Sequence, residues 1–341
     1  MPIPFIIGGV AVVAAAKGIK DGTEAKKNIN EANGINKAAN NMAKEAEEFI
    51  EMAKEKTKES IENLGHEKIK ILTTSINDFI VNFEKIKNIN IKDSDGINEL
   101  QNFNPSSESF KELKNASFEA KNIAVNGLAA IGSGVLLAYG TYSIIMSGVG
   151  GLIVTATTGT ALGTLSGVAA TNATLAWLGG GALAAGGYGM MGGIIVLGGL
   201  VVGPALAIGG SIFASKSRKA LNDSYCNYDK AKLFKAQAKN IGVALKSIFI
   251  KTNQIIEVLQ KLDYYLINYV NKLVEILKSK GSDWGNYSII EKEDIYKCVQ
   301  IAKTIKIILD TSLLKENGEL DEAVNIVLDN GNKYLKMLQQ I

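Results

Sequence analysis

The chain has 341 residues, with 37 Lys and Arg against 34 Asp and Glu and a formal net charge of +3. This small charge does not indicate nucleic-acid binding. Two distant cysteines, Cys226 and Cys298, and a single histidine exclude a disulfide framework and four-ligand Cys/His zinc sites. A Ser-His-Asp or Cys-His mechanism would have to use His66, which lies next to Glu67 in a charged stretch. We therefore expect no enzyme, no cofactor and no metal site.

The first segment, residues 1–20, opens with the apolar run MPIPFIIGGVAVVAAA, and the first basic residue, Lys17, follows it. A secretory signal carries its basic residues before the apolar stretch. The run is also short for a helix that spans a bilayer. We interpret it as an uncleaved apolar segment that packs on the middle of the chain or lies in a membrane interface, with a non-standard export signal as the other interpretation.

The second segment, residues 21–121, is a charged helical arm. Apolar residues spaced alternately three and four apart are typical of a coiled-coil seam. The arm shows this spacing at Ile69, Leu72, Ile76, Phe79, Phe83 and Ile86. The turn-rich stretch 88–105 ends the pattern, and residues 106–121 predict a short polar helix.

The third segment, residues 122–215, carries no charge. After Lys121 the next Asp, Glu, Lys, Arg or His is Lys216, so 94 consecutive positions lack such a residue. The segment also holds 23 of the 35 glycines. Soluble domains carry about one charged residue in four. We call residues 122–215 the charge-free block, and its composition indicates contact with lipid at some stage.

Three windows of the block, 123–140, 143–158 and 182–211, approach the roughly 20 apolar residues of a spanning helix. They predict about four crossings of a bilayer, or two crossings in a hairpin with interfacial segments. Permanent burial inside a soluble bundle is the alternative. It is less expected, because Gly and Ala bury little area per residue.

Glycines in the block recur at four-residue spacing, which lets helices approach closely in a membrane. These positions are the predicted membrane-packing residues: Gly159, Gly163, Gly167, Gly189, Gly193, Gly199 and Gly203. Residues 187–192 also match the dinucleotide pattern G-x-G-x-x-G. That pattern needs an acidic residue about 20 positions later, and the block contains none, so we reject it.

The fourth segment, residues 216–341, is a second helical arm with 4-3 spacing over about five heptads. The expected seam is Ile241, Leu245, Ile248, Thr252, Ile255, Leu259, Leu262, Leu266, Tyr269, Leu273 and Ile276. The sequence GSDWG at 281–285 should end this helix. Two further helices are predicted from Ile295, Cys298, Ala302, Ile305 and Leu309, and from Leu320, Val324, Val327, Tyr334 and Leu338.

Basic residues cluster where the chain leaves the charge-free block. Between positions 216 and 246 there are eight Lys or Arg and two acidic residues. Lys216, Arg218 and Lys219 lead this run, and we predict that they bind anionic headgroups on the cytoplasmic side. An ordinary solvated helix face is the alternative interpretation.

Residues 159–210 and the opening IPFIIGGVAVVAAAKGIKDG resemble a recurrent, uncharacterised bacterial family of glycine-rich helical membrane-associated proteins, some of them labelled as chemotaxis proteins. The resemblance covers these two stretches and implies no established activity. The plan of helical arms around an apolar centre also resembles the helical pore-forming toxins of the tripartite-haemolysin and cytolysin type. More distantly it resembles apolipoprotein L, which has a Gly-rich hairpin between amphipathic helices.

These patterns predict an all-α protein, with long amphipathic arms forming a bundle or coiled coil around a Gly/Ala-rich apolar helical hairpin region. We expect a membrane-inserting protein, pore-forming or membrane-permeabilising, whose block oligomerises through its glycine faces. The alternatives are an integral membrane protein whose arms bind a cytoplasmic partner without forming a pore, and a soluble scaffold that keeps the block buried. The expected partners are a lipid bilayer, further copies of the chain and a helical protein, and not nucleic acid. The expected location is the bacterial inner membrane, or the cytoplasm before insertion, with secretion without an ordinary signal as an option.

Overall fold

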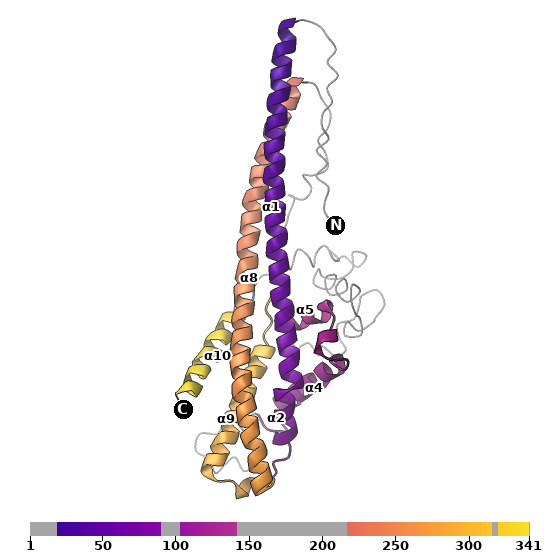
Figure 1. The fold of residues 1–341 in the computed structure, drawn as a ribbon. Helices are drawn as coiled ribbons and strands as arrows, with labels where there is room; N and C mark the ends of the chain where they lie inside the picture. Colours follow the sequence, from indigo (N-terminus) through magenta and orange to yellow (C-terminus); the bar gives the residue numbers. More distant parts are fainter. Residues whose placement is uncertain (1–18, 90–102, 142–216, 316–319, 341) are drawn as a thin grey trace. The chain divides into compact units, whose positions relative to one another are not determined.

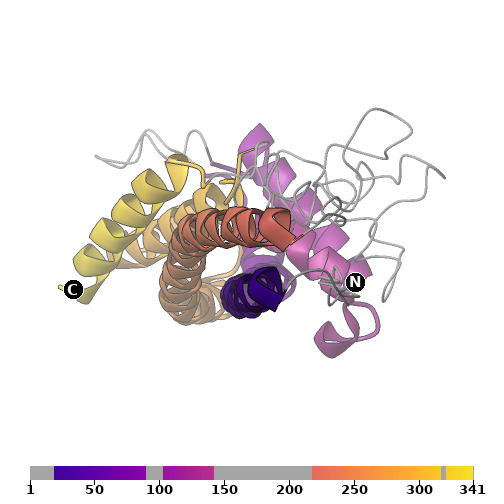
Figure 2. The same ribbon diagram turned by 90° about the horizontal axis from the view of Figure 1, so that it is seen from above.

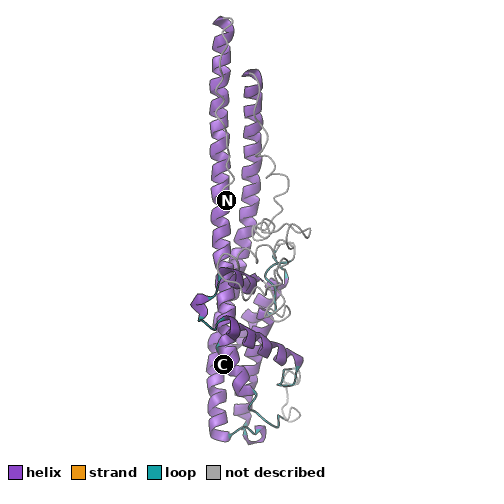
Figure 3. Cartoon of the chain, turned by 90° about the vertical axis from the view of Figure 1, so that its right-hand side faces the viewer, coloured by secondary structure: helices purple, strands orange, loops and turns teal. Residues whose placement is uncertain are grey.

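The computed structural model describes residues 19–89, 103–141, 217–315 and 320–340. The protein is all-α, as the sequence predicts, and every regular element among the described residues is a helix (Figure 3). The chain divides into two compact units. Unit 1 combines Met1–Glu55 with Gly198–Lys246, and unit 2 combines Lys56–Leu197 with Ser247–Ile341.

Two long helices contribute to both units. Helix α1 spans Ile19–Thr73 and helix α8 spans Ser217–Lys280. Unit 2 also contains α2 (Ser75–Phe83), α4 (Glu108–Ile123), the 3-10 turn η2 (Leu128–Ala130) and α5 (Ser133–Thr141). After α8 come the turn η6 (Trp284–Asn286), α9 (Ile289–Leu309) and α10 (Ala323–Gln339).

The two helix segments of unit 1 run in the same direction along each other (Figure 1). Near their beginnings the hydroxyl of Tyr225 donates to Glu31 at 2.9 Å, and further along Lys235 pairs with Glu45 at 3.0 Å. The later residue of α8 contacts the later residue of α1, so the two helices run parallel. The sequence predicts packed arms, and their parallel direction is a property that only the structure gives.

Alanine dominates the seam of unit 1. Among the described residues, its buried apolar side chains are Ala32, Ala39, Ala43, Ala46, Ile50, Ala231, Ala238, Ile241 and Leu245. Small side chains let two helices approach closely, but each removes little apolar area from water. Hydrophobic burial therefore stabilises unit 1 only weakly for its length.

Unit 2 holds the main hydrophobic core, in which the α1 and α8 segments also run parallel. Ser60 accepts a hydrogen bond from Asn253 at 3.1 Å, and Glu67 accepts one from Gln260 at 3.4 Å. Figures 1 and 2 show α10 on one side of this pair and α4 and α5 on the other. Lys272 of α8 pairs with Asp294 at 2.9 Å, so α9 returns antiparallel to α8.

The predicted seams are confirmed. Every residue of the α8 seam is buried except Tyr269, which is partly buried, and Thr252 is fully buried with its hydroxyl donating to the carbonyl of Ile248. All five apolar residues expected in α9 are buried. Of the residues predicted for the last helix, Val324 and Leu338 are buried and Val327 and Tyr334 pack at the edge of the core, whereas Leu320 packs there from before the helix, because α10 begins only at Ala323. Helix α8 ends at Lys280, where Gly281 has a φ of 76°, a conformation that favours glycine.

Two sequence expectations need correction. The six-residue seam from Ile69 to Ile86 is fully buried, but it does not lie on one helix, because the chain kinks at Thr74 (φ −111°, ψ −97°) between α1 and α2. The window 123–140 is not one spanning helix either. Helix α4 ends at Ile123 and Gly127 adopts a φ of 92°, so only α5 continues as α-helix. Glycine weakens a helix that is exposed to water, which explains the interruption.

Four phenylalanines close the end of the core formed by α2 and α4. The ring of Phe110 lies 5.8–6.1 Å from the rings of Phe79, Phe83 and Phe103.

We predict that Phe110→Ala lowers the free energy of unfolding of unit 2 by about 3–5 kcal/mol, because it opens a cavity among these rings. Chemical denaturation measures this loss. Phe118→Ala, on the exposed face of the same helix, is the control and should change stability by less than about 0.5 kcal/mol.

Candidate functional site: the docked start of the charge-free block

The residues predicted to act in a membrane fall mostly outside the described residues. This holds for all seven membrane-packing glycines and for Lys216. Arg218 and Lys219 lie in the first turn of α8, so the basic exit from the block is helical. The part of the charge-free block that the structure describes is 122–141, and α5 is its longest helix.

Helix α5 docks on α1 through two reciprocal glycine contacts. A Cβ atom on Gly65 of α1 would collide with the backbone carbonyl of Leu136, and one on Gly140 of α5 would collide with the backbone carbonyl of Ile61. Each helix therefore presents a glycine to the backbone of the other. The residue numbers run in opposite directions, so α5 crosses α1 antiparallel. Such mutual small-residue contacts are the means by which helices pack closely in membranes, and here they hold the start of the block inside unit 2.

The side chains of α5 complete the core of unit 2. Val135, Leu137 and Tyr139 are buried, with 5%, 0% and 0% of their surface exposed. Burying each such side chain is worth about 1.5–3 kcal/mol relative to exposing it. The helix carries no charge on any face, so it can be placed either in a protein core or in lipid without burying a charge.

Two polar atoms of the docked helix have no hydrogen-bond partner among the described residues. They are the hydroxyls of Tyr139 and Thr141, which are both buried. A buried polar group without a partner costs about 1–3 kcal/mol. The backbone of Thr141 is anchored, because its carbonyl accepts a 2.7 Å hydrogen bond from the amide of Leu313 just after α9. The docked helix therefore combines a close backbone fit with two buried hydroxyls that lack partners among the described residues.

A buried lysine lies one helical turn beyond the glycine contact. Lys68 is 1% exposed, and burial lowers its pKa to about 7, although the negative charge of Asp310 on α9 acts in the opposite direction. Asp310 also faces Lys306, at 3.7 Å, and Lys306 pairs with Glu112 of α4 at 3.0 Å. Ionisable side chains of α1, α4 and the end of α9 thus lie near one another at the border of the core.

Another buried carboxyl lies on α8. Asp263 accepts a hydrogen bond from the hydroxyl of Ser75, the first residue of α2. Burial raises the pKa of Asp263, and this hydrogen bond opposes the shift. This hydrogen bond joins the start of α2 to α8 at the kink after α1, so we assign Asp263 a role in stabilising the fold.

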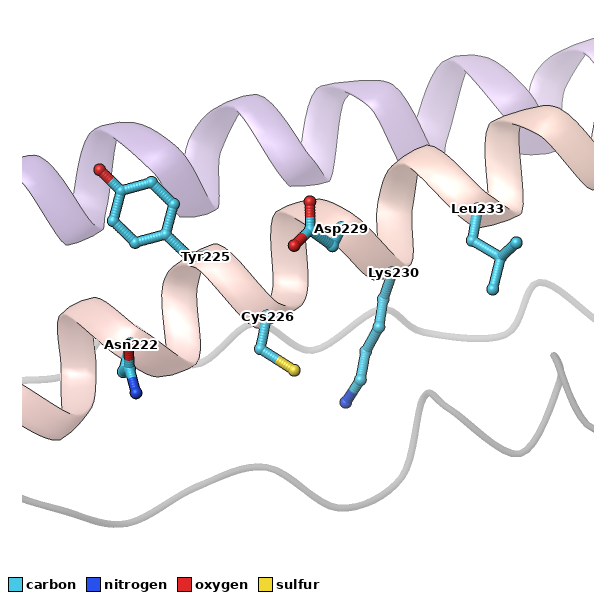
Figure 4. A pocket seen from close by; sticks show the side chains of 6 residues that line it. All are labelled: Asn222, Tyr225, Cys226, Asp229, Lys230 and Leu233. Atoms are coloured by element: carbon cyan, nitrogen blue, oxygen red, sulfur yellow. The ribbon is translucent and has the colours of Figure 1, made fainter.

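The remaining polar features of the described residues include an open hollow on α8 and two free cysteines. The hollow has a volume of about 520 Å³. Figure 4 shows the side chains that line it: Asn222, Tyr225, Cys226, Asp229, Lys230 and Leu233. Both cysteines are free; Cys298 is buried and Cys226 is exposed. The described ranges contain no group of three or more His, Cys, Asp or Glu side chains placed to hold a metal ion.

Gly65 and Lys68 are the key residues that sequence reasoning missed. A glycine within a long Ala, Glu and Lys-rich helix is a weak signal, because a helix in water gains stability from alanine there, but Gly22 and Gly34 of the same helix carry the same signal. Lys68 has no such signal, since lysines are frequent along the whole arm. Its burial depends on α9, which follows more than 200 residues later.

Within the described residues, no helix is both long and apolar enough to cross a bilayer. No protein-family model matches the chain, and no significant match was found among curated proteins or solved structures.

Proposed function

We propose that this is a membrane-inserting α-helical protein of the pore-forming or membrane-permeabilising kind. In this proposal the helical units store the start of the charge-free block, and the block enters the bilayer and assembles through its glycine faces. The observation that carries the proposal is the uncharged helix α5, which docks in unit 2 through Gly65 and Gly140 while two buried hydroxyls lack partners among the described residues. No catalytic role is part of the proposal.

The balance of free energies supports a transfer from core to lipid. Apolar side chains such as Leu137 leave water in either environment, so the hydrophobic contribution largely cancels between the two states. The polar atoms do not cancel, because Tyr139 can place its hydroxyl at the headgroup level, where water is available. Undocking relieves the penalty of the buried hydroxyls and loses the close backbone contact at Gly65. A modest change in the surrounding helices is enough to shift such a balance.

Dye release from anionic liposomes tests the proposal with purified protein and no detergent. A parallel flotation assay on the same sample reports binding. Release together with flotation is the expected result. Flotation without release would contradict pore formation and favour the integral protein that binds a partner. If the protein gives neither release nor flotation over a pH range that includes acidic and basic values, that result would contradict membrane insertion.

The oligomerisation part of the proposal predicts that Gly163→Leu abolishes dye release. Leucine would hold neighbouring helices apart at the predicted packing face. Circular dichroism of the soluble protein should remain unchanged, because residue 163 belongs to none of the described helices. Leu162→Ala, at the neighbouring position, is a control that keeps the glycine face intact. Full release by Gly163→Leu would contradict the packing model.

A further inference from the structure

The turn between α8 and α9 presents a second apolar surface that the charge-free block does not account for. We call residues 281–292 the tip. Ile289 and Ile290, the first two residues of α9, are 77% and 72% exposed. These values are among the highest for large apolar side chains in the described residues, and the two isoleucines are adjacent. Such a pair has no role in the core of unit 2.

Hydrogen bonds and ring packing fix the conformation of the tip and with it the position of the two isoleucines. Ser288 caps α9, and its hydroxyl accepts from the amide of Glu291, whose carboxylate accepts from the amide of Ser288 at 2.7 Å. The rings of Trp284 and Tyr287 are buried beneath the turn, and the hydroxyl of Tyr287 donates to the carbonyl of Gly281 at 2.7 Å. A preorganised apolar surface binds without a large loss of conformational entropy.

The backbone after α2 reinforces this end of unit 2. The amide of Lys87 donates to the carbonyl of Ser282 at 2.7 Å, and the amide of Trp284 donates to the carbonyl of Lys87 at 3.1 Å. These bonds bring a second exposed chain segment beside the tip and fix its position. Lys87 therefore belongs to the same end of unit 2 as the exposed isoleucines.

The charges around the tip favour an anionic partner. Two acidic side chains are occupied by local hydrogen bonds, because Asp283 accepts from the amide of Gly285 and from Asn88, and Glu291 accepts from Ser288. The lysines are placed differently. Lys278 and Lys280 are exposed in the last turn of α8, Lys87 is exposed beside them, and Lys292 extends over the face of Trp284. Three exposed lysines, Lys87, Lys278 and Lys280, therefore lie at this end of unit 2, against one exposed acidic residue of α9, Glu293.

We propose that the tip is a membrane-contact site, in which Ile289 and Ile290 enter the interface of an anionic phospholipid bilayer and the neighbouring lysines meet its headgroups. Two isoleucine side chains offer roughly 200 Å² of apolar area. A stable protein interface needs about 800 Å² from each partner, so the patch is too small for one. Shallow insertion of a few apolar side chains beside basic residues is the established physics of interfacial binding. The inference rests on the proposed membrane function, but it does not require a pore.

The first test compares vesicle binding by two full-length variants. Ile289→Ser/Ile290→Ser, the tip variant, removes the two exposed apolar side chains of the tip. The control variant, Ile326→Ser/Met337→Ser, removes two comparably exposed apolar side chains from α10. Titration with phosphatidylglycerol vesicles should show about tenfold weaker partitioning for the tip variant and an unchanged value for the control. Equal partitioning of the two variants would overturn the proposal. If sedimentation shows that the natural chain forms a dimer and that the tip variant does not, while lipid binding is unchanged, the tip is a protein interface and the membrane proposal is overturned.

A second test locates the tip directly and separates it from pore formation. In a Cys226→Ser background, an environment-sensitive dye on Ile290→Cys should shift its emission to the blue when anionic vesicles are added. The same dye on Ile326→Cys should not shift, and neutral phosphatidylcholine vesicles should give a smaller effect at position 290. A shift without dye release would support the tip and contradict the pore. Release without a shift at position 290 would contradict the tip alone.

Discussion

Replacing Gly65 with alanine is expected to undock α5 and to increase membrane activity. The new Cβ would collide with the backbone carbonyl of Leu136, and no side-chain rotation can remove that collision. Overpacking of this kind costs about 1–3 kcal/mol. A shift of 1.4 kcal/mol changes the ratio of docked to undocked molecules about tenfold. Amide hydrogen exchange of residues 133–141 should therefore become faster, and dye release at a fixed protein concentration should rise about tenfold.

The same helix provides a matched control for this substitution. Gly34 also lies in α1, but a Cβ there would meet nothing within 4 Å. Gly34→Ala should therefore stabilise the protein by about 0.5–1 kcal/mol through helix propensity and leave exchange in α5 unchanged. The two Gly→Ala variants should thus change stability in opposite directions. Unchanged exchange in α5 of the Gly65 variant would show that the glycine contact does not hold the helix.

Replacing Lys68 with methionine is expected to remove much of the dependence of unit 2 stability on pH between about 7 and 10. The pKa of Lys68 is lowered from 10.5 to about 7 in the folded chain, so the unfolded chain binds more protons in this range. Stability therefore rises with pH there, by up to about 1.4 kcal/mol per pH unit, and the destabilisation is complete below about pH 7. At neutral pH the variant should be about 1–4 kcal/mol more stable than the natural chain.

Chemical denaturation at pH 7 and pH 9 measures this effect. The expected gain for Lys68→Met is large at pH 7 and smaller at pH 9. Lys121→Met, at an exposed position at the end of α4, is the control and should change stability by less than about 0.5 kcal/mol at both values. An unaltered pH slope in Lys68→Met would show that this lysine is not the titrating group. If undocking of α5 limits insertion, the natural chain should also release dye more readily at pH 7 than at pH 9.

The physical basis for predicting the arms from sequence is local periodicity. The 4-3 spacing along α8 marks one face of a helix whatever that face meets, and 10 of its 11 predicted residues are buried. Gly281 likewise predicts the end of α8, because glycine readily adopts the positive φ found there. The kink at Thr74 carries no comparable signal, since the apolar spacing continues through it from Leu72 to Ile76. Packing between distant segments overrides the local pattern at that point.

The sequence alone determined the all-α class, the helical seams and the charge-free block, because composition and spacing are properties of neighbouring residues. Only the tertiary structure decided the parallel direction of α1 and α8, the docking of α5 at Gly65, the burial of Lys68 and the exposure of Ile289 and Ile290. Each of these depends on segments that are far apart along the chain. Gly65 and Gly34 illustrate the difference, because both are glycines of α1. Only Gly65 is packed against another helix, α5, so only there does the structure leave no room for a Cβ atom.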